Sequence, residues 1–458
     1  MTTTSIHTND HKRKQYTIPW NGDQRTLTIP RANVSAELGM TDFPPLADPW
    51  QAIVDAMESP LGCAPLAEQI RPRSKVVLLT GDRFTDEMLG RWHGFGFHFL
   101  DYLNRLGVRD EDVTLVYAPG SHPSPAWRER LGADLLQRVR AIRHDCFDEA
   151  SMSYLGVTSR CTPVWINREV AEADFRLGFG EISPNVHGGW CGGGKIILPG
   201  VAAWETIEQN HFGVIHPTNT VGLADGNHMR RDMEEGARMA GLDFKVDLLV
   251  DSKARIVDVY AGDFVTEHRT AIESKARDIW MTKMAPADIY VLHPGAGFDQ
   301  YLSSSFFIRM EGAELGTKED GIIILVLSAA GGWAAPGRGS QPGDMDGEQT
   351  CDFFQSGTEA MARAMVRREV NVRTASILYT ARRVLERRKV FLVCDGIAPQ
   401  MAADLGFAYC SDNFDDALAT AFADRGPDAQ VAVNLVASTN ENPPGRPVAW
   451  RVMPWREG

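Results

Sequence analysis

The sequence predicts an α/β protein of two domains with mostly parallel sheets, and three observations favour this fold class. The chain has 458 residues, which is more than one ordinary core can organise. Continuous apolar runs, typical of strands covered on both faces, occur at 75–80, 113–117, 287–292, 321–328, 389–394 and 430–437. Stretches with helical spacing lie between these runs, as an alternating strand-and-helix layer requires.

The N-terminal part of the sequence predicts an arm, a hairpin and a first α/β layer. Residues 1–15 are polar and predict a disordered arm. Residues 16–30 alternate between apolar and polar on both sides of Asn21-Gly22, which is a strong hairpin signal. The elements predicted next are a helix over 49–59, a strand over 75–80, a helix ending near 107, a strand over 113–117 and a helix over 125–142. We assign residues 16–280 to this first domain.

The C-terminal part predicts a second layer of the same kind. Residues 243–262 predict a hairpin turned at 251–253, and a helix is expected over 264–283. Strand-like runs restart at 287, so we assign residues 281–458 to a second domain. Residues 331–350 are rich in Gly, Pro and Asp, and a loop of this length favours a lid that carries Trp333 and Arg338.

Composition and charge limit the partners of this protein. A hydrophobic fraction of 43% is typical of a soluble protein, and a net charge of -13 argues against nucleic acid as the partner. The longest apolar run, 321–330, is too short to span a bilayer, so no membrane partner is expected. Seven scattered cysteines without a C-x-x-C pair suit reduced thiols. We therefore expect a cytoplasmic protein that acts on a small-molecule substrate.

Polar side chains follow two of the predicted strands at the point where each strand ends. Asp82 and Arg83 come after the strand at 75–80, and His122 follows the strand at 113–117. Because ligands bind outside the carboxyl ends of strands in open α/β sheets, we expect these side chains to face one crevice.

The densest chemical signal is a glycine-rich stretch that ends in a lysine. Seven glycines lie between Gly178 and Gly194, and Lys195 follows. The segment GWCGGGKI satisfies the G-x-x-x-x-G-K core of an ATP-binding loop, but Ile196 occupies the position where such a loop needs Ser or Thr for magnesium. ATP hydrolysis is thus disfavoured. A phosphate cradle fits better, and its predicted members are Gly192, Gly193, Gly194 and Lys195.

Two histidines accompany this stretch, and a third lies at the earlier strand end. The spacing of His187, Lys195 and His211 fits no metalloprotease helix. One imidazole can nevertheless hold a metal whose other donors belong to a cofactor. A phosphate-bearing ligand and a metal are therefore both implied.

These pieces resemble the lactate racemase family. The run GGGKIILPGVAAWETIEQNH is similar to its signature, and the similarity extends to MESPLGCAPLAEQ, to Gly120-Ser121-His122 and to AGDFVTEHRTAIESKARD. Members bind a nickel-pincer nucleotide, pyridinium-3,5-bisthiocarboxylic acid mononucleotide with nickel, supplied by cofactor-synthesis enzymes. The resemblance implies a cofactor site in the cleft between the domains.

The resemblance also implies roles for individual residues. Lys195 would match the lysine that attaches covalently to the pincer in some members, and His211 would match the nickel ligand. His122 would match one of two catalytic bases. The implied reaction is racemisation or epimerisation by hydride transfer at a hydroxyl-bearing carbon, in which the protein supplies proton transfer and positioning.

The sequence departs from the family pattern at the second base. Asn185 stands ten residues before Lys195, where racemases of the family place a histidine, and His187 lies two residues further on. Residues i and i+2 of an extended segment point to the same face, so His187 is one candidate for the missing base. A one-base enzyme is the other alternative.

Two cations of the family's substrate site are also missing. Thr85 stands where the family has an arginine, and Ser304 and Phe307 stand in place of its Gln-x-x-Lys. The absence of both cations argues against lactate as the substrate, because a bound carboxylate is stabilised most by a charge-assisted hydrogen bond. Arg83 is nearby, but its side chain should leave the backbone in a different direction, whereas Arg309 or Arg338 could compensate.

Several substrates and functions therefore stay open. The first prediction is an enzyme that acts on a 2-hydroxy acid or sugar acid other than lactate. The alternative is an epimerase or oxidoreductase that acts on a neutral sugar or polyol, which would stack on Trp92, Trp190 or Trp333. A cofactor-binding protein without turnover and, more weakly, a phosphohydrolase are the rivals.

Overall fold

The first of two α/β layers is a sheet whose strands run parallel except at one edge. The computed structural model describes residues 12–81, 86–124, 126–295, 298–306, 309–335, 344–435 and 453–455. The strand order is β13 (Ile256–Gly262), β12 (Phe244–Val250), β9 (Phe175–Glu181), β4 (Val76–Gly81), β5 (Val113–Ala118) and β6 (Arg140–Arg143). Only β13 pairs antiparallel, as the predicted hairpin with β12 requires.

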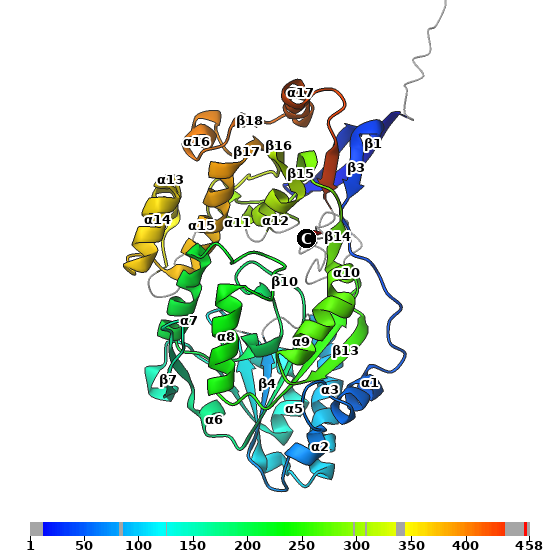
Figure 1. Cartoon of the computed structure of the whole chain (residues 1–458), viewed down its shortest axis with the longest axis vertical. Helices are drawn as coiled ribbons and strands as arrows, with labels where there is room; N and C mark the ends of the chain where they lie inside the picture. Colours follow the sequence, from blue (N-terminus) through cyan, green and yellow to red (C-terminus); the bar gives the residue numbers. More distant parts are fainter. Residues whose placement is uncertain are drawn as a thin grey trace, which may run out of the picture.

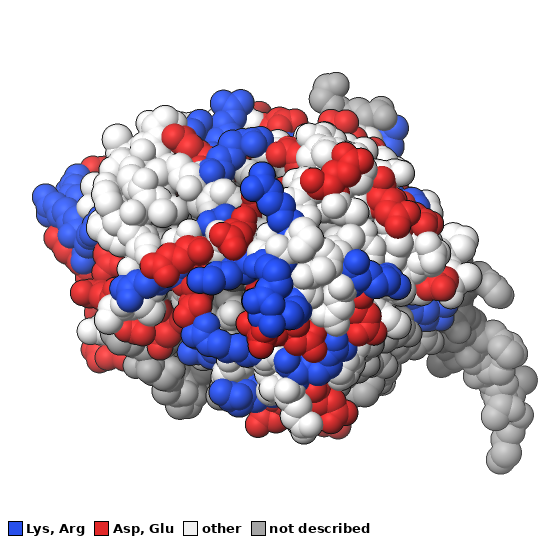
Figure 2. All heavy atoms as spheres, turned by 90° about the horizontal axis from the view of Figure 1, so that it is seen from below, with Lys and Arg blue, Asp and Glu red and all other residues white. Residues whose placement is uncertain are grey.

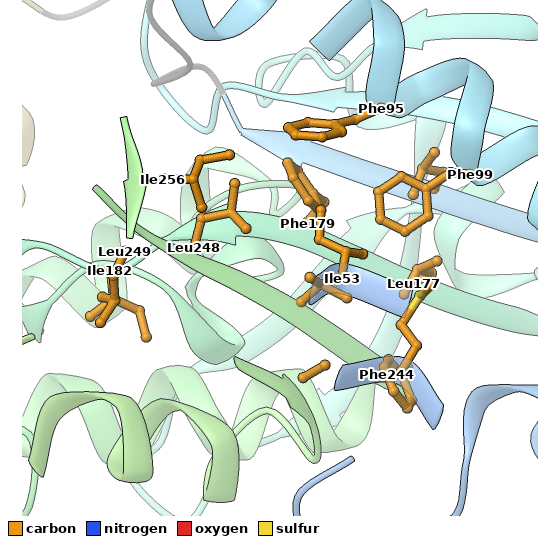
Figure 3. Close-up of a cluster of buried hydrophobic side chains, with 14 of the residues drawn as sticks. Ile53, Phe95, Phe99, Leu177, Phe179, Ile182, Phe244, Leu248, Leu249 and Ile256 are labelled. Carbon is orange, nitrogen blue, oxygen red and sulfur yellow. The ribbon is translucent and has the colours of Figure 1, made fainter. Parts of the chain in front are cut away.

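Apolar side chains cover both faces of this first sheet. On one face, helices α1 (Pro49–Glu58) and α3 (Asp86–Arg105) pack a cluster around Phe179, whose ring meets that of Phe99 edge-on at 5.4 Å (Figure 3). On the other face, Ile196 and Ile197 pack with α8 (His228–Met239). The segment around Lys195 therefore belongs to the layer that covers the sheet.

The second layer is a sheet with parallel pairing throughout the described strands. Its order is β18 (Tyr409–Ser411), β17 (Lys389–Val393), β16 (Thr317–Val326), β15 (Ala287–Leu292), β19 (Val431–Asn434) and β3 (Val34–Glu37). The four strands predicted from apolar runs in this half are all present. These two layers confirm an α/β fold with mostly parallel sheets.

The N-terminal hairpin lies against the second sheet, although the first sheet follows it in the sequence (Figure 1). Strands β1 (Arg13–Trp20) and β2 (Asp23–Pro30) turn at Asn21-Gly22, where both residues have positive φ, so the predicted hairpin is confirmed. Ile18 and Leu27 pack with strands of the second sheet. The predicted disordered arm was too long, because β1 already begins at Arg13. Residues 13–37 thus join the second layer, while the division at 280/281 stays a prediction.

The remaining described elements connect and cover the two sheets. The helices are α2 (Leu66–Gln69), α4 (Trp127–Leu131), α5 (Ala133–Arg138), α6 (Arg168–Ala171), α7 (Trp204–His211), α9 (Thr266–Ala271), α10 (Arg277–Trp280), α11 (Leu302–Ser305), α12 (Arg309–Gly316), α13 (Gly347–Gln355), α14 (Gly357–Val366), α15 (Val372–Arg387), α16 (Pro399–Asp404) and α17 (Phe414–Arg425). The short strands are β7 (Met152–Val157), β8 (Pro163–Asn167), β10 (Pro184–Asn185), β11 (Gly189–Trp190), β14 (Met281–Lys283) and β20 (Met453–Trp455).

Two predicted segments differ from the structure. The single helix expected over 125–142 is two short helices broken at Gly132, which has a φ of 83°, and its end is the strand β6. The lid expected over 331–350 is helical from Gly347, where Asp346 forms a capping box. Residues 336–343 of that loop lie outside the described part of the chain.

The two layers meet through helix α15 of the second and helix α7 of the first (Figure 1). The carboxylate of Glu311, on α12, accepts a hydrogen bond from Arg383 of α15 at 3.0 Å, and Thr220 and Val221 of the first layer lie near enough to act on its pKa. Burial raises the pKa of Glu311 to about 7, against the opposing effect of Arg383. A titratable group therefore lies at the junction of the layers.

The Glu311 carboxyl predicts a pH dependence of stability. A folded pKa raised from 4.5 to about 7 contributes stability that is complete below pH 4.5 and is lost as the pH rises through 7. Between pH 5 and pH 8, the free energy of unfolding of the wild-type protein should therefore fall by about 1–3 kcal/mol relative to that of Glu311→Gln. Urea unfolding of both proteins across this range measures the difference, and parallel pH profiles would contradict it.

Charged side chains of both signs cover the surface shown in Figure 2. On the face shown in Figure 2, Lys and Arg alternate with Asp and Glu, and neither sign gathers into one patch. Among the described helices, none has the length and apolarity that a membrane span needs.

Candidate functional site

A pocket lies at the carboxyl edge of the first sheet, where the strands β4, β5 and β9 end. Its cavity volume is about 90 Å³, and the hollow opens to solvent. The residues that line it are Gly81, Ala118, Phe179, Gly180, Glu181, Cys191, Gly192, Lys195, Ile196 and Lys245. The sheet topology thus brings the end of β4, the end of β5 and the glycine-rich stretch to one place, as expected from the strand ends.

The three glycines before Lys195 have different structural roles. Gly192 has a φ of 82° and lines the pocket together with Lys195. Gly193 donates its amide to Asp247 Oδ2 at 2.6 Å, and a Cβ there would come within 2.8 Å of the Phe264 carbonyl. The predicted phosphate cradle therefore needs correction: the Gly193 amide is used inside the protein, and Gly194 is packed against α8.

Side chains of α8 and α9 hold the backbone that leads to Lys195. The fully buried Arg230 donates to the carbonyls of Gly188, Trp190 and Gly192, and His268 Nε2 donates to the carbonyl of Cys191 at 2.8 Å. Burial and the charge of Arg230 hold the pKa of His268 well below its usual range, so this imidazole is neutral. Hydrogen bonds within the protein therefore hold the wall of the pocket in place before any ligand binds.

A buried ion pair lies beneath this wall, and it was not predicted from the sequence. Lys245 and Asp247, on β12, form an ion pair with side-chain exposures of 1% and 0%, and Lys245 also lines the pocket. Burial and the charge of Asp247 raise the pKa of the neighbouring Glu267 well above its usual range. The signal was present in FKVDLLV, because two charged residues at i and i+2 of an otherwise apolar strand share one buried face.

His211 is a buried, neutral imidazole at the end of α7. Burial, Lys195 and His122 lower its pKa to about 3 and outweigh the nearby Ile207 carbonyl. Its Nδ1 atom is buried and has no hydrogen-bond partner among the described residues. A neutral imidazole is the form that binds a metal, so His211 fits the role of a ligand.

The loop after β5 places His122 close to the same point. The amide of Gly120 donates to the carbonyl of Gly200 at 2.9 Å, which ties this loop to the segment that follows Lys195. His122 is half-buried, and it acts electrostatically on His211 together with Lys195. The structure thus brings His122, Lys195 and His211 together from three separate parts of the chain.

His187 joins this group, whereas Asn185 has a structural role. The rings of His187 and His211 lie 4.8 Å apart at an angle of 59°. Asn185 Oδ1 accepts hydrogen bonds from the amides of His187 and Gly188 at 3.1 and 3.0 Å. Because an amide has no basic nitrogen and this oxygen already caps the turn, the prediction that Asn185 takes part in catalysis finds no support in its contacts.

The two tryptophans proposed as substrate contacts are packed instead. Trp190 is 0% exposed and donates its indole N–H to the carbonyl of Gly222 at 2.8 Å. Trp333 is 7% exposed, donates to Thr350 Oγ1 at 3.0 Å and packs on Phe306 and Phe354. Neither ring offers a free face to a sugar, so both predictions are corrected.

The remaining residues discussed for the substrate and cofactor sites fall into two groups. Asp82, Arg83, Thr85 and Arg338 lie outside the described residues, as does Phe307. Arg309 begins α12 near Tyr290 and His293 and is 2% exposed. In the part of the chain that the structure describes, none of its three guanidinium nitrogens has a hydrogen-bond partner. Burial lowers the pKa of Arg309 to about 9, which still leaves it charged at pH 7. It is therefore an unpaired cation on the second layer.

Within the described residues, no group of three or more His, Cys, Asp or Glu side chains is arranged to hold a metal. Together, the residues of the site define the class of this protein. It is an α/β protein with a small-molecule pocket at the carboxyl edge of a parallel sheet, where a lysine lies beside buried imidazoles.

Comparison with known proteins indicates a likeness to one family. A family model described as the lactate racemase N-terminal domain matches residues 21–222. Lactate racemase from Thermoanaerobacterium thermosaccharolyticum is 28% identical over 62% of this chain and 66% of its own length, just under two thirds. Lactate racemase from Lactiplantibacillus plantarum is 25% identical over 84% of this chain and 88% of its own. The N-terminal part of the chain thus matches the lactate racemase family model, and the chain is distantly similar to two lactate racemases.

Solved structures support the same fold. The lactate racemase apoprotein from Thermoanaerobacterium thermosaccharolyticum superimposes with a TM-score of 0.73 at 22% identity, over 93% of this chain and 99% of its own. A protein from Thermotoga maritima superimposes with a TM-score of 0.57 at 15% identity, over 91% of this chain and 100% of its own. At these identities the likeness concerns the fold.

Proposed function

We propose that this protein is a nickel-pincer nucleotide-dependent racemase or epimerase of a 2-hydroxy acid or sugar acid other than lactate. The observation that carries the proposal is the neutral His211 imidazole, whose buried Nδ1 has no partner, beside Lys195 and His122. His211 would hold the nickel and Lys195 would anchor the nucleotide, with its pocket in the cleft between the two layers. When bound, the cofactor supplies a reversible hydride acceptor for the substrate carbon.

The residues of the chain would move the proton and orient the substrate. His122 and His187 lie on separate loops beside His211 and are the candidates to take the hydroxyl proton of the substrate and to return it. The fixed carbonyls around Trp190 hold this wall in place, so the bases need little reorganisation during the reaction.

We propose that an acidic substrate pairs with the guanidinium of Arg309, which lies on the second layer and is not among the residues that line the pocket of the first. A buried charge without a partner is costly, and a carboxylate is the group that pairs with a guanidinium most strongly. The burial of Trp190 and Trp333 removes two of the proposed sugar platforms. An oxidoreductase or epimerase of neutral polyols is therefore less well supported.

Isotope labelling of a substrate panel tests the proposed reaction. Protein made with the cofactor-synthesis enzymes is given 2-hydroxy acids, sugar acids and polyols that carry deuterium at the hydroxyl-bearing carbon. Hydride transfer keeps the deuterium in the epimer, whereas abstraction of a carbon-bound proton loses it to water. Washed-out deuterium would contradict hydride transfer. No turnover by protein that retains nickel and nucleotide would favour the non-catalytic binding protein.

Replacing Arg309 with methionine should separate substrate binding from stability. Removing an unpaired buried charge should stabilise the folded protein by about 1–4 kcal/mol in urea unfolding. Discrimination between an acid and its neutral analogue should fall by about 10–100-fold in kcat/KM, because one charge-assisted hydrogen bond is lost. Arg383→Met is the contrast, since it strands the Glu311 carboxyl and should destabilise the protein. Unchanged discrimination in Arg309→Met would show that Arg309 does not bind the acid.

A further inference from the structure

A second lysine reaches the pocket from strand β12, beneath the wall that carries Lys195. The side chain of Lys245 is 1% exposed, yet it lines the same cavity of about 90 Å³ as Lys195. The two lysines are far apart in the sequence and come together because β12 pairs with β9, which ends at the pocket. A cavity of this volume has room for several water molecules, and thus for one compact anionic group.

Two glycines of β9 make room for the Lys245 side chain. A Cβ at Gly178 would lie 2.8 Å from Lys245 Cδ, and a Cβ at Gly180 would lie 2.9 Å from Lys245 Nζ and 2.7 Å from Asp247 Oδ1. Contacts this short would force Lys245 or Asp247 to move. Gly180 itself lines the pocket. This part of the glycine-rich stretch therefore gives the ammonium of Lys245 its place beside the pocket.

Asp247 holds the ammonium of Lys245 without using all of its protons. Lys245 Nζ donates to Asp247 Oδ1 and, at 3.1 Å, to the carbonyl of Val246. An ammonium has three protons, and among the described residues these two acceptors take two of them. Asp247 is itself held in place, because its Oδ2 accepts from the Gly193 amide at 2.6 Å. Within the described part of the chain, one N–H of a fixed ammonium thus remains for a group in the pocket.

Cations outnumber carboxylates around this pocket. The cations are those of Lys195, Lys245 and Arg230, and the carboxylates are those of Glu181 and Asp247. Burial and the charge of Asp247 favour the neutral form of the nearby Glu267, because they raise its pKa well above its usual range. A bound anion would therefore compensate a positive charge that the protein leaves at this place.

We propose that Lys245 is a second cation of the pocket and binds a phosphate group between its ammonium and that of Lys195. Strand β12 then supplies the anion-binding donor that the Gly193 amide cannot supply, since this amide donates to Asp247. Hydrogen bonds between ammonium groups and a phosphate are charge-assisted, and they are roughly twice as strong as neutral ones. The assignment of this phosphate to a pyridinium nucleotide rests on the proposed function, whereas the phosphate site itself does not.

Binding of model ligands to the apo protein tests this site without turnover. Isothermal titration calorimetry compares nicotinate mononucleotide, which is a pyridinium nucleotide with a phosphate, with the nucleoside that lacks the phosphate. The mononucleotide should bind at least about tenfold tighter than the nucleoside, and inorganic phosphate should compete with it. Equal affinities for the two compounds, or no binding of either, would overturn the proposal.

A double variant that keeps the net charge isolates the contribution of Lys245. Lys245→Met with Asp247→Asn removes one charge of each sign and keeps an acceptor for the Gly193 amide. Its affinity for nicotinate mononucleotide should fall about 10–100-fold, because one charge-assisted hydrogen bond is lost. The matched control, Lys389→Met with Asp424→Asn, removes an exposed 2.9 Å ion pair of the same residue types from the second layer and should bind as the wild type. An equal loss in the control, or no loss in the first variant, would contradict the role of Lys245.

A crystal structure of the wild-type protein makes the test independent of how well the variant folds. Crystals of the apo protein soaked with nicotinate mononucleotide should show phosphate oxygens within about 3 Å of Nζ of both Lys195 and Lys245. A phosphate bound at any other place in the protein would overturn the proposal.

These measurements separate the phosphate site from the proposed function. If the mononucleotide binds through Lys245, but the protein loaded with nickel and nucleotide turns over no substrate, the site is supported and the proposed function is not. If Lys245→Met with Asp247→Asn retains the nickel nucleotide as firmly as the wild type and stays fully active, the result counts against the site and leaves the proposed function intact.

Discussion

Protein carrying Lys195→Ala, made together with the cofactor-synthesis enzymes, is expected to retain neither a covalent adduct nor bound nickel. Lys195 lines the pocket at the carboxyl edge of the first sheet and acts electrostatically on His211. Its replacement removes both the proposed attachment point and a cation next to an anionic nucleotide. Intact mass spectrometry should show the unmodified chain mass, nickel content should fall at least about tenfold, and racemase activity should disappear.

Two further variants make this result specific. Lys195→Arg keeps the charge without the attachable amine, so it should bind the nucleotide reversibly and show no adduct. Lys253→Ala, at an exposed position in the turn between β12 and β13, should behave as the wild type. A wild-type protein without adduct, nucleotide and nickel would contradict the proposed cofactor; absence of the adduct alone would contradict only the covalent link.

The Asp247→Ala variant is expected to lose about 3–5 kcal/mol of folding free energy, because it leaves the ammonium of Lys245 buried and unpaired. It also removes the acceptor for the Gly193 amide. Since Gly193 directly precedes the Gly194-Lys195 pair, the pocket wall should loosen along with the core. Urea unfolding measures the loss, and hydrogen exchange of the Gly193 amide reports the local effect.

A double variant tests whether the unpaired charge is the cause. Lys245→Met with Asp247→Asn removes the ammonium and keeps an oxygen that can accept from Gly193, so most of the lost stability should return. If the double variant is as unstable as Asp247→Ala, the cost comes from lost packing and the role given to the buried charge is wrong.

Local sequence patterns determined the layers of this protein. The apolar runs at 113–117 and 287–292 became strands because a continuous buried run suits a parallel sheet covered on both faces. Asn21-Gly22 turned the hairpin because both positions take positive φ. The glycine density before Lys195 also marked the wall of the pocket, and the resemblance of this segment indicated the family.

The partners of these segments were decided by the tertiary structure. Strand β3 pairs with a strand of the second sheet, the Gly193 amide donates to Asp247, and His187 forms a hydrogen bond with Ser376 of the second layer. Periodicity reports which face of an element is buried, but the side chain that it meets there depends on how distant elements pack. The identity of the candidate lysine and histidines was therefore contained in the sequence. Their electrostatic environment exists only because the fold removes water and brings remote groups into contact.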